Sequence, residues 1–247
     1  MACPSAGPLG TLPIIVDFYE ALSVRFNVAV LILAAGGSTR FGSPKQIAYF
    51  QGETLVQRCI NSAGEVFPNS ITVVLGAHYE KIEPSVTGAQ IAHNPLWQNG
   101  LGGSIAYGIG HIDAAAEAVL ILLADQIYIS AKEIRLMVEA FNGDNIVAAK
   151  YSGARGVPAI FPRSSFAGLG GLVGDVGAKK LLAMTKVPIV EISLPQAAVD
   201  IDHVEDLPTQ CQQKLGQDLR LFFHSVLTHN VPSSNHTHGL CGGWITE

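Results

Sequence analysis

The chain has 247 residues, a formal net charge of −5 and a sequence pI near 5.9. Hydrophobic residues make up 48% of it and charged residues only 14%, which excludes an intrinsically disordered chain and is enough for one sizeable α/β core. Its negative charge gives no general field for binding nucleic acid, so an anionic substrate must be captured by local cations.

Cysteine spacing and apolar runs bear on the cellular setting. The four cysteines lie far apart with no Cys-x-x-Cys pair, which favours neither a zinc site nor a disulfide framework and is typical of a reducing compartment. No basic stretch precedes an apolar one at the start, and no apolar run reaches the ~20 residues that cross a bilayer. We therefore expect a cytoplasmic protein with no membrane partner.

Hydrophobic periodicity predicts one α/β domain that begins near Val28, after a lead-in (1–27), and a C-terminal extension (208–247) follows it. The extension contains four histidines whose spacing fits no ordered metal site. Strands are expected at Val28–Ala35, Ile71–Leu75, Ala89–Ala92, Val119–Ala124, Ile146–Ala149 and Pro188–Leu194. Helices are expected at Glu53–Ala63, His78–Ile82, Ser104–Gly110 and Ile134–Phe141.

The most informative stretch is Val28–Gln46. Its apolar run stops at Gly36-Gly37, as in a strand that is buried on both faces and ends in a turn. Glycines let backbone N–H groups approach a ligand closely, and Arg40 and Lys45 bring two cations to the same loop. This combination predicts a polyphosphate site.

Two better-known phosphate loops do not fit this stretch. A Walker loop requires Gly-Lys-Ser/Thr, whereas Gly42 is followed by Ser43-Pro44 and then Lys45. The dinucleotide fingerprint requires three glycines at fixed offsets, which Gly36, Gly37 and Gly42 do not supply. From the glycines alone, the alternative is a strand-to-helix turn with solvated charges.

The string LAAGGSTRFGSPKQ, Leu33–Gln46, resembles the signature loop of nucleotidyltransferases with the nucleotide-diphospho-sugar-transferase fold. Its double glycine and Pro-Lys-Gln ending are most similar to the molybdenum cofactor cytidylyltransferase branch. The resemblance covers about residues 28–207 and implies a single Rossmann-like, three-layer α/β domain with a mostly parallel mixed sheet. The nucleotide-binding residues that it implies in this loop are Leu33, Ala34, Ala35, Gly36, Gly37, Ser38, Arg40 and Lys45.

Two later turns follow the same family pattern. The turn after the second strand lies near the nucleotide base in the family, which puts Gly76 there. The stretch His93–Ser104 is similar to the family's Asn-Pro-x-Trp-x-x-Gly-x-x-x-Ser segment, so Gly100 and Ser104 are expected to bind nucleotide. Trp97 either stacks on a ring or fills the core, and Ser104 also suits a helix N-cap.

Carboxylates follow two of the expected strands. Asp125 ends an apolar run, and open α/β sheets place ligands at the carboxyl ends of their strands. Because a triphosphate loop is expected beside it, Asp125 is predicted to be a Mg²⁺ ligand. The alternative is that Asp125 caps a helix. Asp200-Ile201-Asp202 resembles the family's Asp-Ile-Asp ending, in which the second aspartate completes the metal site. The family's Asp-Gln-Pro is Asp125-Gln126-Ile127 here, which leaves the shape of that turn open.

The acceptor side is implied by resemblance alone. Arg155–Phe161 resembles a Gly-x-Pro-x-x-Phe strand that lines this side, which makes Arg155 an acceptor-phosphate contact or simply an exposed arginine. Gly174–Gly177 resembles the family's Gly-Asp-x-Gly element, so Asp175 and Lys179 are acceptor-binding candidates. For Asp175 the alternative is a helix N-cap.

The implied reaction is attack by a phosphate monoester on the α-phosphorus of a nucleoside triphosphate, which releases pyrophosphate. Such transfers depend mostly on positioning and on electrostatic stabilisation, for which Lys45, Arg40 and Asp125 are the catalytic residues and Mg²⁺ the cofactor. The second pKa of a phosphate monoester lies near ~6, so the nucleophile needs no general base.

The resemblance further implies CTP as donor, molybdopterin as acceptor and a molybdenum oxidoreductase as client. The alternatives are a guanylyltransferase for the same cofactor, a cytidylyltransferase for a sugar or polyol phosphate, and a non-catalytic carrier of the pterin. Lys45, Asp125 and Asp202 favour catalysis, since a carrier needs no metal-ready pair of carboxylates.

Overall fold

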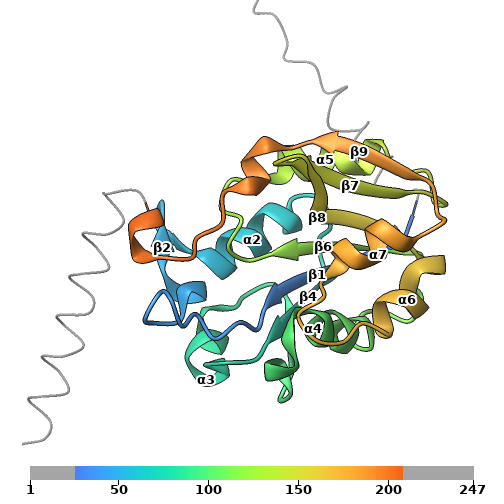
Figure 1. Cartoon of the computed structure of the whole chain (residues 1–247). Coiled ribbons are helices and arrows are strands. Elements are labelled where there is room, and N and C mark those ends of the chain that lie inside the picture. Colours follow the sequence, from blue (N-terminus) through green and yellow to red (C-terminus); the bar gives the residue numbers. More distant parts are fainter. Residues whose placement is uncertain (1–25, 208–247) are drawn as a thin grey trace, which may run out of the picture.

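The computed structural model describes residues 26–207 (Figure 1). Residues 1–25 of the expected lead-in and the whole of the 208–247 extension, with its histidines, lie outside this range. Every helix between residues 26 and 207 is too short or too polar to cross a membrane.

The fold is built on a seven-stranded sheet in the order β5-β4-β1-β6-β8-β7-β9. Strand β8 is antiparallel to both of its neighbours, and all other pairs are parallel. This confirms the predicted mostly parallel mixed sheet. The strands are β1 (Val28–Ala34), β4 (Ile71–Leu75), β5 (Gln90–His93), β6 (Ala118–Leu123), β7 (Ile146–Tyr151), β8 (Ala154–Pro162) and β9 (Ile189–Ser193). A separate antiparallel pair is formed by β2 (Tyr49–Phe50) and β3 (Glu53–Thr54).

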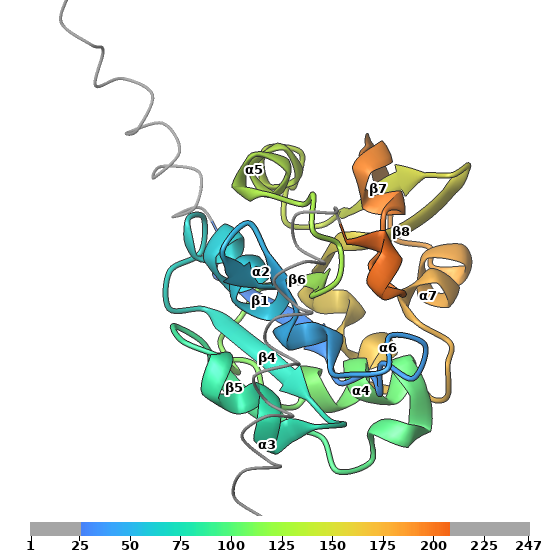
Figure 2. The ribbon, with the colours of Figure 1, turned by 90° about the vertical axis from the view of Figure 1, so that its left-hand side faces the viewer.

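Helices cover both faces of the sheet and complete three layers (Figure 2). They are α2 (Leu55–Gly64), α3 (Tyr79–Ile82), α4 (Gly100–Ile109), α5 (Ala131–Glu139), α6 (Phe166–Gly170) and α7 (Ala178–Met184). Side chains alternate along β1: Val30 and Ile32 pack with residues of α2 and α5, whereas Leu31 and Leu33 pack with residues of α4, α6 and α7. Burial on both faces explains why this strand is an unbroken apolar run.

Helix α4 lies unusually close to the sheet because one of its residues is a glycine. A Cβ at Gly108 would lie 2.5 Å from Leu31 Cδ1 and 2.9 Å from Val74 Cγ2. Any larger residue at this position would push the helix away from β1 and β4. The same closeness brings the start of α4 next to the carboxyl end of β1.

The capping residues explain where α2 and α5 begin. Helix α2 begins at Leu55 because Thr54 is its N-cap and accepts a hydrogen bond from the Gln57 N–H. Helix α5 begins at Ala131, where Ser130 and Glu133 form a reciprocal capping box. Since Ser130 is the cap, Asp125 is not used to start this helix.

The expected start of α4 at Ser104 is wrong. The helix already begins at Gly100, so Ser104 lies inside it, is buried, and accepts a hydrogen bond from Asn94 Nδ2 at 3.2 Å. Glycines are poor helix formers, and the sequence pattern therefore placed the start too late.

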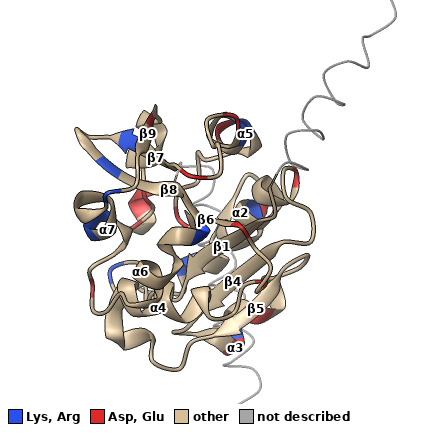
Figure 3. Ribbon diagram, turned by 90° about the vertical axis from the view of Figure 1, so that its right-hand side faces the viewer, with Lys and Arg blue, Asp and Glu red and all other residues tan. Residues whose placement is uncertain are grey.

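Basic and acidic residues are intermixed over the fold in Figure 3. This distribution agrees with the expectation, from the net charge, that anions are captured locally and not by a surface of one sign.

Glu133 offers a test of the capping box. Burial disfavours its charged form, but hydrogen bonds from Ser130 outweigh that cost and hold the pKa of Glu133 below its usual value of 4.5. We expect Glu133→Gln to lower the free energy of unfolding by about 1 kcal/mol at pH 7, because a neutral amide is the weaker acceptor. The measurement is urea denaturation at several pH values.

The sign of the pH dependence follows from the lowered pKa. The stabilisation is complete above pH 4.5 and is lost as the pH falls through the folded-state pKa, so the gap between wild type and Glu133→Gln should close in acid. Glu139→Gln, at an exposed position of the same helix, is the control. An equal gap at pH 7 and pH 3.5 would contradict this account.

Candidate active site

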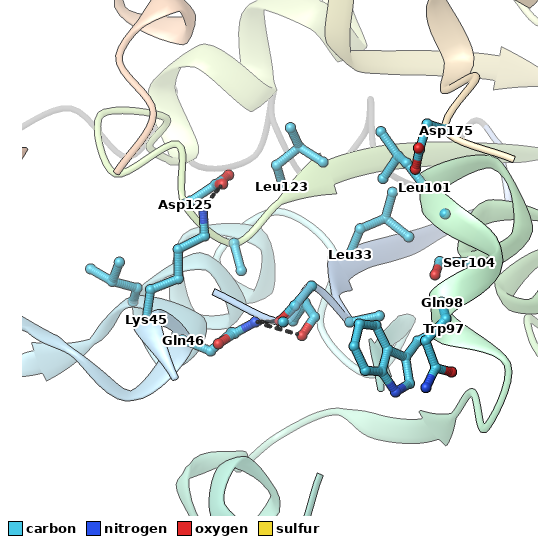
Figure 4. Close-up of a pocket in the computed structure, with 17 residues that line it drawn as sticks. Leu33, Lys45, Gln46, Trp97, Gln98, Leu101, Ser104, Leu123, Asp125 and Asp175 are labelled. Carbon is cyan, nitrogen blue, oxygen red and sulfur yellow. Dashed lines mark hydrogen bonds and ion pairs between the residues drawn. The ribbon is translucent and has the colours of Figure 1, made fainter. Parts of the chain in front are cut away.

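A cavity of about 400 Å³ lies at the carboxyl ends of β1 and β6 (Figure 4). The chain leaves β1 toward β4 on one side and later returns to β6 on the other, which is where open α/β sheets place ligands. The residues that line the cavity are Leu33, Ala34, Ala35, Gly36, Gly37, Lys45, Gln46, Leu55, Trp97, Gln98, Gly100, Leu101, Ser104, Leu123, Ala124, Asp125 and Asp175.

The loop after β1 uses its carbonyl groups but not its amides. Gln46 Nε2 donates to the carbonyls of Ala34 and Gly36 at 3.0 and 2.9 Å, and the Ala77 N–H donates to the Ala35 carbonyl at 3.1 Å. In contrast, the N–H groups of residues 36–40 donate no hydrogen bond to any residue in the described range. Gly36 and Gly37 of this row line the cavity, and unused backbone donors beside a cavity suit the binding of an anion.

Ser38 connects this loop to Lys45. Its backbone is left-handed, with φ 51°, and its hydroxyl donates to Gln46 Oε1 at 3.2 Å while accepting the Lys45 N–H at 3.2 Å. The turn therefore folds back so that the side chain of Lys45 reaches the end of β6.

Lys45 binds two carboxylates that are distant in sequence. Its Nζ lies 2.7 Å from Asp125 Oδ2, 3.0 Å from Asp202 Oδ1 and 2.8 Å from the Ile201 carbonyl oxygen. An ammonium group has three N–H donors, so all of them are in use. Arg40 adds a second cation, with its Nη1 2.9 Å from Asp202 Oδ2.

The charges of this cluster stabilise one another. Burial lowers the pKa of Lys45, but the neighbouring Asp125 and Asp202 outweigh it and raise that pKa above 10.5. The hydrogen bond from Lys45 likewise lowers the pKa of Asp202. Partial burial and the nearby Asp125 raise the pKa of Asp200 to about 6, which adds a third acid that the sequence did not single out.

Backbone contacts position the two carboxylates. The Asp206 carboxylate accepts the N–H groups of Asp202 and His203 at 2.9 and 2.7 Å and so fixes the segment after Ile201. At the end of β6, the Ile127 N–H donates to the Asp125 carbonyl at 3.1 Å. The family's proline has no N–H and could not make this bond, so in this chain a hydrogen bond from Ile127 closes the turn.

The two carboxylates fit a divalent cation. Asp125 Oδ1 is buried without a hydrogen-bond partner, and such an oxygen is costly unless a donor or cation satisfies it. No cluster of three or more His, Cys, Asp or Glu residues able to hold a metal occurs in residues 26–207. Because Mg²⁺ prefers oxygen ligands, Asp125 and Asp202 suit this ion, with phosphate oxygens and water completing its coordination.

Trp97 packs against the core and also lines the cavity, where its stacking on a bound ring stays a prediction. Its ring lies against Gly37, where a Cβ would be 3.3 Å from two ring atoms, and it contacts the cluster that includes Leu33. Gly76 lies against the base of the tryptophan: a Cβ there would be 2.4 Å from Trp97 Cβ and 2.8 Å from the Ala35 oxygen. Gly76 therefore makes room for Trp97 behind the cavity wall and is not among the residues that line the cavity.

The same side of the cavity joins the start of α4 to the loop before α7, across from Lys45 and Asp125 (Figure 4). Gly100 has φ +87°, and a Cβ there would be 2.4 Å from Asp175 Oδ1 and 2.5 Å from the Gly174 carbon. The Gly102 N–H donates to the Gly174 carbonyl at 2.8 Å. Asp175 thus reaches the cavity, and Ser104 reaches it from inside α4 (Figure 4).

Two of the expected acceptor-binding residues lie outside the cavity. Arg155 is exposed on β8, and its Nε donates to Glu191 Oε1 at the sheet edge at 2.6 Å. Lys179 is exposed on α7. A role for either in binding would require an acceptor that extends beyond the cavity, whereas Asp175 needs no such extension.

The sequence analysis missed the contribution of buried amides. Gln46 and Gln126 are only 3% and 4% exposed. Gln126 Nε2 donates to the carbonyls of Val157 and Ala197 at 3.1 and 2.8 Å and so ties the turn after β6 to neighbouring segments. The available signal was their position: each glutamine directly follows a charged residue assigned to the site.

This fold and this site, with unused amides and a cation and carboxylate cluster around one cavity, define a nucleotidyltransferase with the nucleotide-diphospho-sugar-transferase fold. The family model described as MobA-like NTP transferase domain matches residues 30–190, well over half of the chain. The chain belongs to that family.

Similar proteins cover most of the chain. Nicotine blue oxidoreductase of Paenarthrobacter nicotinovorans is 26% identical over 196 residues, which are 73% of this chain and 94% of that protein. The rv0371c homologue from Mycobacterium sp. strain JC1 is 26% identical with a TM-score of 0.64, covering 79% and 98% of the two chains. Rv0371C of Mycobacterium tuberculosis in complex with manganese shares the fold at 22% identity, with a TM-score of 0.62 and coverage of 73% and 95%.

The support of Trp97 by Gly76 can be tested. Gly76→Ala is expected to displace the tryptophan and lower the free energy of unfolding by about 1–3 kcal/mol, as overpacking does. A Trp244→Phe background leaves Trp97 as the single tryptophan, so its fluorescence reports the displacement. Gly170→Ala is the control, since nothing lies within 4 Å of a Cβ there. Unchanged fluorescence and stability in Gly76→Ala would refute this packing.

Proposed function

We propose that this protein transfers CMP from CTP to the terminal phosphate of molybdopterin, releases pyrophosphate, and does so in the cytoplasm. The observation that carries the nucleotidyltransferase part is the cluster in which Lys45 Nζ lies within 3.0 Å of both Asp125 and Asp202. Lys45 and Asp125 line the same cavity as Gly36 and Gly37, whose amides are unused. The choice of CTP and of the pterin is supported by the likeness of Leu33–Gln46 to the cytidylyltransferase branch.

The residues take separate roles in this proposal. The amides of residues 36–40 and the Arg40 guanidinium bind the β- and γ-phosphates, which leave as pyrophosphate. Lys45 binds the α-phosphate, where negative charge increases in the transition state. The acceptor phosphate is already ionised at neutral pH, so no residue has to remove a proton.

Asp125 and Asp202 would hold the metal ion. A divalent cation bound there supplies Lewis-acid stabilisation of the phosphate oxygens. The manganese complex of the Mycobacterium tuberculosis protein supports a divalent ion, although at 22% identity that protein shares only the fold. Acceptor binding is assigned to Asp175, with Arg155 and Lys179 in reach only of a larger acceptor.

Pyrophosphate release tests the assignment. We expect release only when CTP, molybdopterin and Mg²⁺ are all present. Equal release with GTP would replace the cytidylyltransferase by a guanylyltransferase, and release with a sugar or polyol phosphate in place of the pterin would replace the acceptor. If the pterin binds but no triphosphate is consumed, the protein is a carrier and the proposal is wrong.

Asp125→Ala is expected to lower turnover at least ~100-fold, the size of effect seen when one group that stabilises the transition state is removed. The same variant should lose Mn²⁺ binding, measured by electron paramagnetic resonance. Asp113→Ala is the control, because Asp113 is exposed and precedes β6 at the opposite edge of the sheet. Normal Mg²⁺-dependent turnover in Asp125→Ala would refute the role assigned to this carboxylate.

A further inference from the structure

The side chain of Gln46 is fully engaged with the phosphate loop. It is 3% exposed, and its Nε2 donates to the Ala34 and Gly36 carbonyls at 3.0 and 2.9 Å. Its Oε1 accepts the Ser38 hydroxyl at 3.2 Å. Both N–H groups and the oxygen of the Gln46 amide are therefore hydrogen-bonded, to residues 34, 36 and 38 at the end of β1 and in the turn after it.

Other groups hold the neighbouring carbonyls of the turn: the Ala77 N–H donates to the Ala35 carbonyl at 3.1 Å, and His78 Nε2 lies 3.3 Å from the Gly37 carbonyl oxygen. Gln46 holds the carbonyls of residues 34 and 36, where a Cβ added at Gly36 would meet nothing within 4 Å. Glycine adopts many backbone conformations, so the sequence of the loop does not by itself decide which way its peptide groups face. An outside contact is needed to decide it.

Reversing the peptide groups would reverse the chemistry of the loop. In the observed orientation the carbonyls of residues 34 and 36 face Gln46, and the amides of residues 36–40 remain available. A carbonyl oxygen turned toward the cavity would repel a phosphate, whereas an N–H group attracts it. The orientation therefore decides whether the loop binds an anion.

We propose that Gln46 is a positioning residue that keeps the carbonyls of the loop turned away from the nucleotide and its amides turned toward the triphosphate. It acts through the backbone of residues 34–38 and, by way of the Ser38 hydroxyl, through the N–H of Lys45. This inference rests on the proposed binding of a nucleoside triphosphate in the cavity.

The test compares two buried amides. Gln46→Met keeps the volume but removes the donors and the acceptor without adding charge. Asn145→Leu is the matched control: Asn145 is 4% exposed, donates to the Ala140 carbonyl at 3.0 Å and accepts the Asn142 N–H at 2.8 Å. It precedes β7, at the edge of the sheet opposite the cavity.

Inorganic tripolyphosphate and CTP with Mg²⁺ are the probes, with binding followed by calorimetry and folding by the melting temperature. We expect Gln46→Met to weaken binding of both probes about 10- to 100-fold, the effect of leaving one or two polar groups unsatisfied. Ser38→Ala should weaken it less, because Gln46 still holds both carbonyls. Asn145→Leu should melt lower than wild type yet bind both probes normally.

Steady-state kinetics separate positioning from simple loss of structure. In Gln46→Met the KM for the triphosphate should rise while the KM for the acceptor stays unchanged. The inference is overturned if Gln46→Met binds tripolyphosphate as wild type does, if wild type does not bind it, or if Asn145→Leu loses binding equally. Failure of the proposed function gives a different result: the wild-type protein binds tripolyphosphate but releases no pyrophosphate in the turnover assay.

Discussion

The ammonium group of Lys45 is the point on which this site depends. It joins the glycine loop to the end of β6 and to the segment after β9, which are 80 and 157 residues away in the chain. Its side chain is only 15% exposed, and that of Asp125 only 21%, so their attraction is less weakened by water than that of surface pairs. A buried lysine without these partners would be expensive, and the carboxylates would repel each other without the lysine.

Close backbone approach is the second constraint, and it explains where the glycines are. Gly108 lets α4 lie near β1, Gly76 makes room for Trp97, and Gly100 makes room for Asp175. Each of these contacts brings a wall of the cavity within reach of the loop after β1. Gly76 and Gly100 were predicted to bind the nucleotide, and the structure shows that both allow neighbouring segments of the cavity wall to pack closely.

Much of the fold was predictable because burial on both faces leaves a clear pattern. The unbroken apolar runs of β1 and β6 indicated buried strands, and open α/β sheets place ligands at the carboxyl ends of such strands, which assigned Asp125 to the site. Asp202 was assigned by the resemblance of its segment to the family's Asp-Ile-Asp ending. The structure brings both carboxylates to Lys45.

The contacts that the sequence did not reveal have physical reasons for being hidden. Gln46 and Asp206 act by binding backbone groups, and nothing in composition or periodicity reports a partner of that kind. The start of α4 was misplaced because packing against the 174–177 segment overrides the poor helix propensity of its glycines. The direction of the Arg155 side chain depends on Glu191 of β9, which lies beyond β7 at the edge of the sheet and was not considered.

The full coordination of Lys45 has a consequence for how strongly it can attract a substrate. Since its three N–H groups already have acceptors, an incoming phosphate oxygen has to displace one of them, and the free energy gained is only the difference between the two partners. An oxygen of ordinary charge gains little by this exchange, whereas one that becomes more negative gains more. The lysine is thereby suited to discriminate between the resting substrate and its transition state, and contributes less to holding the substrate in place.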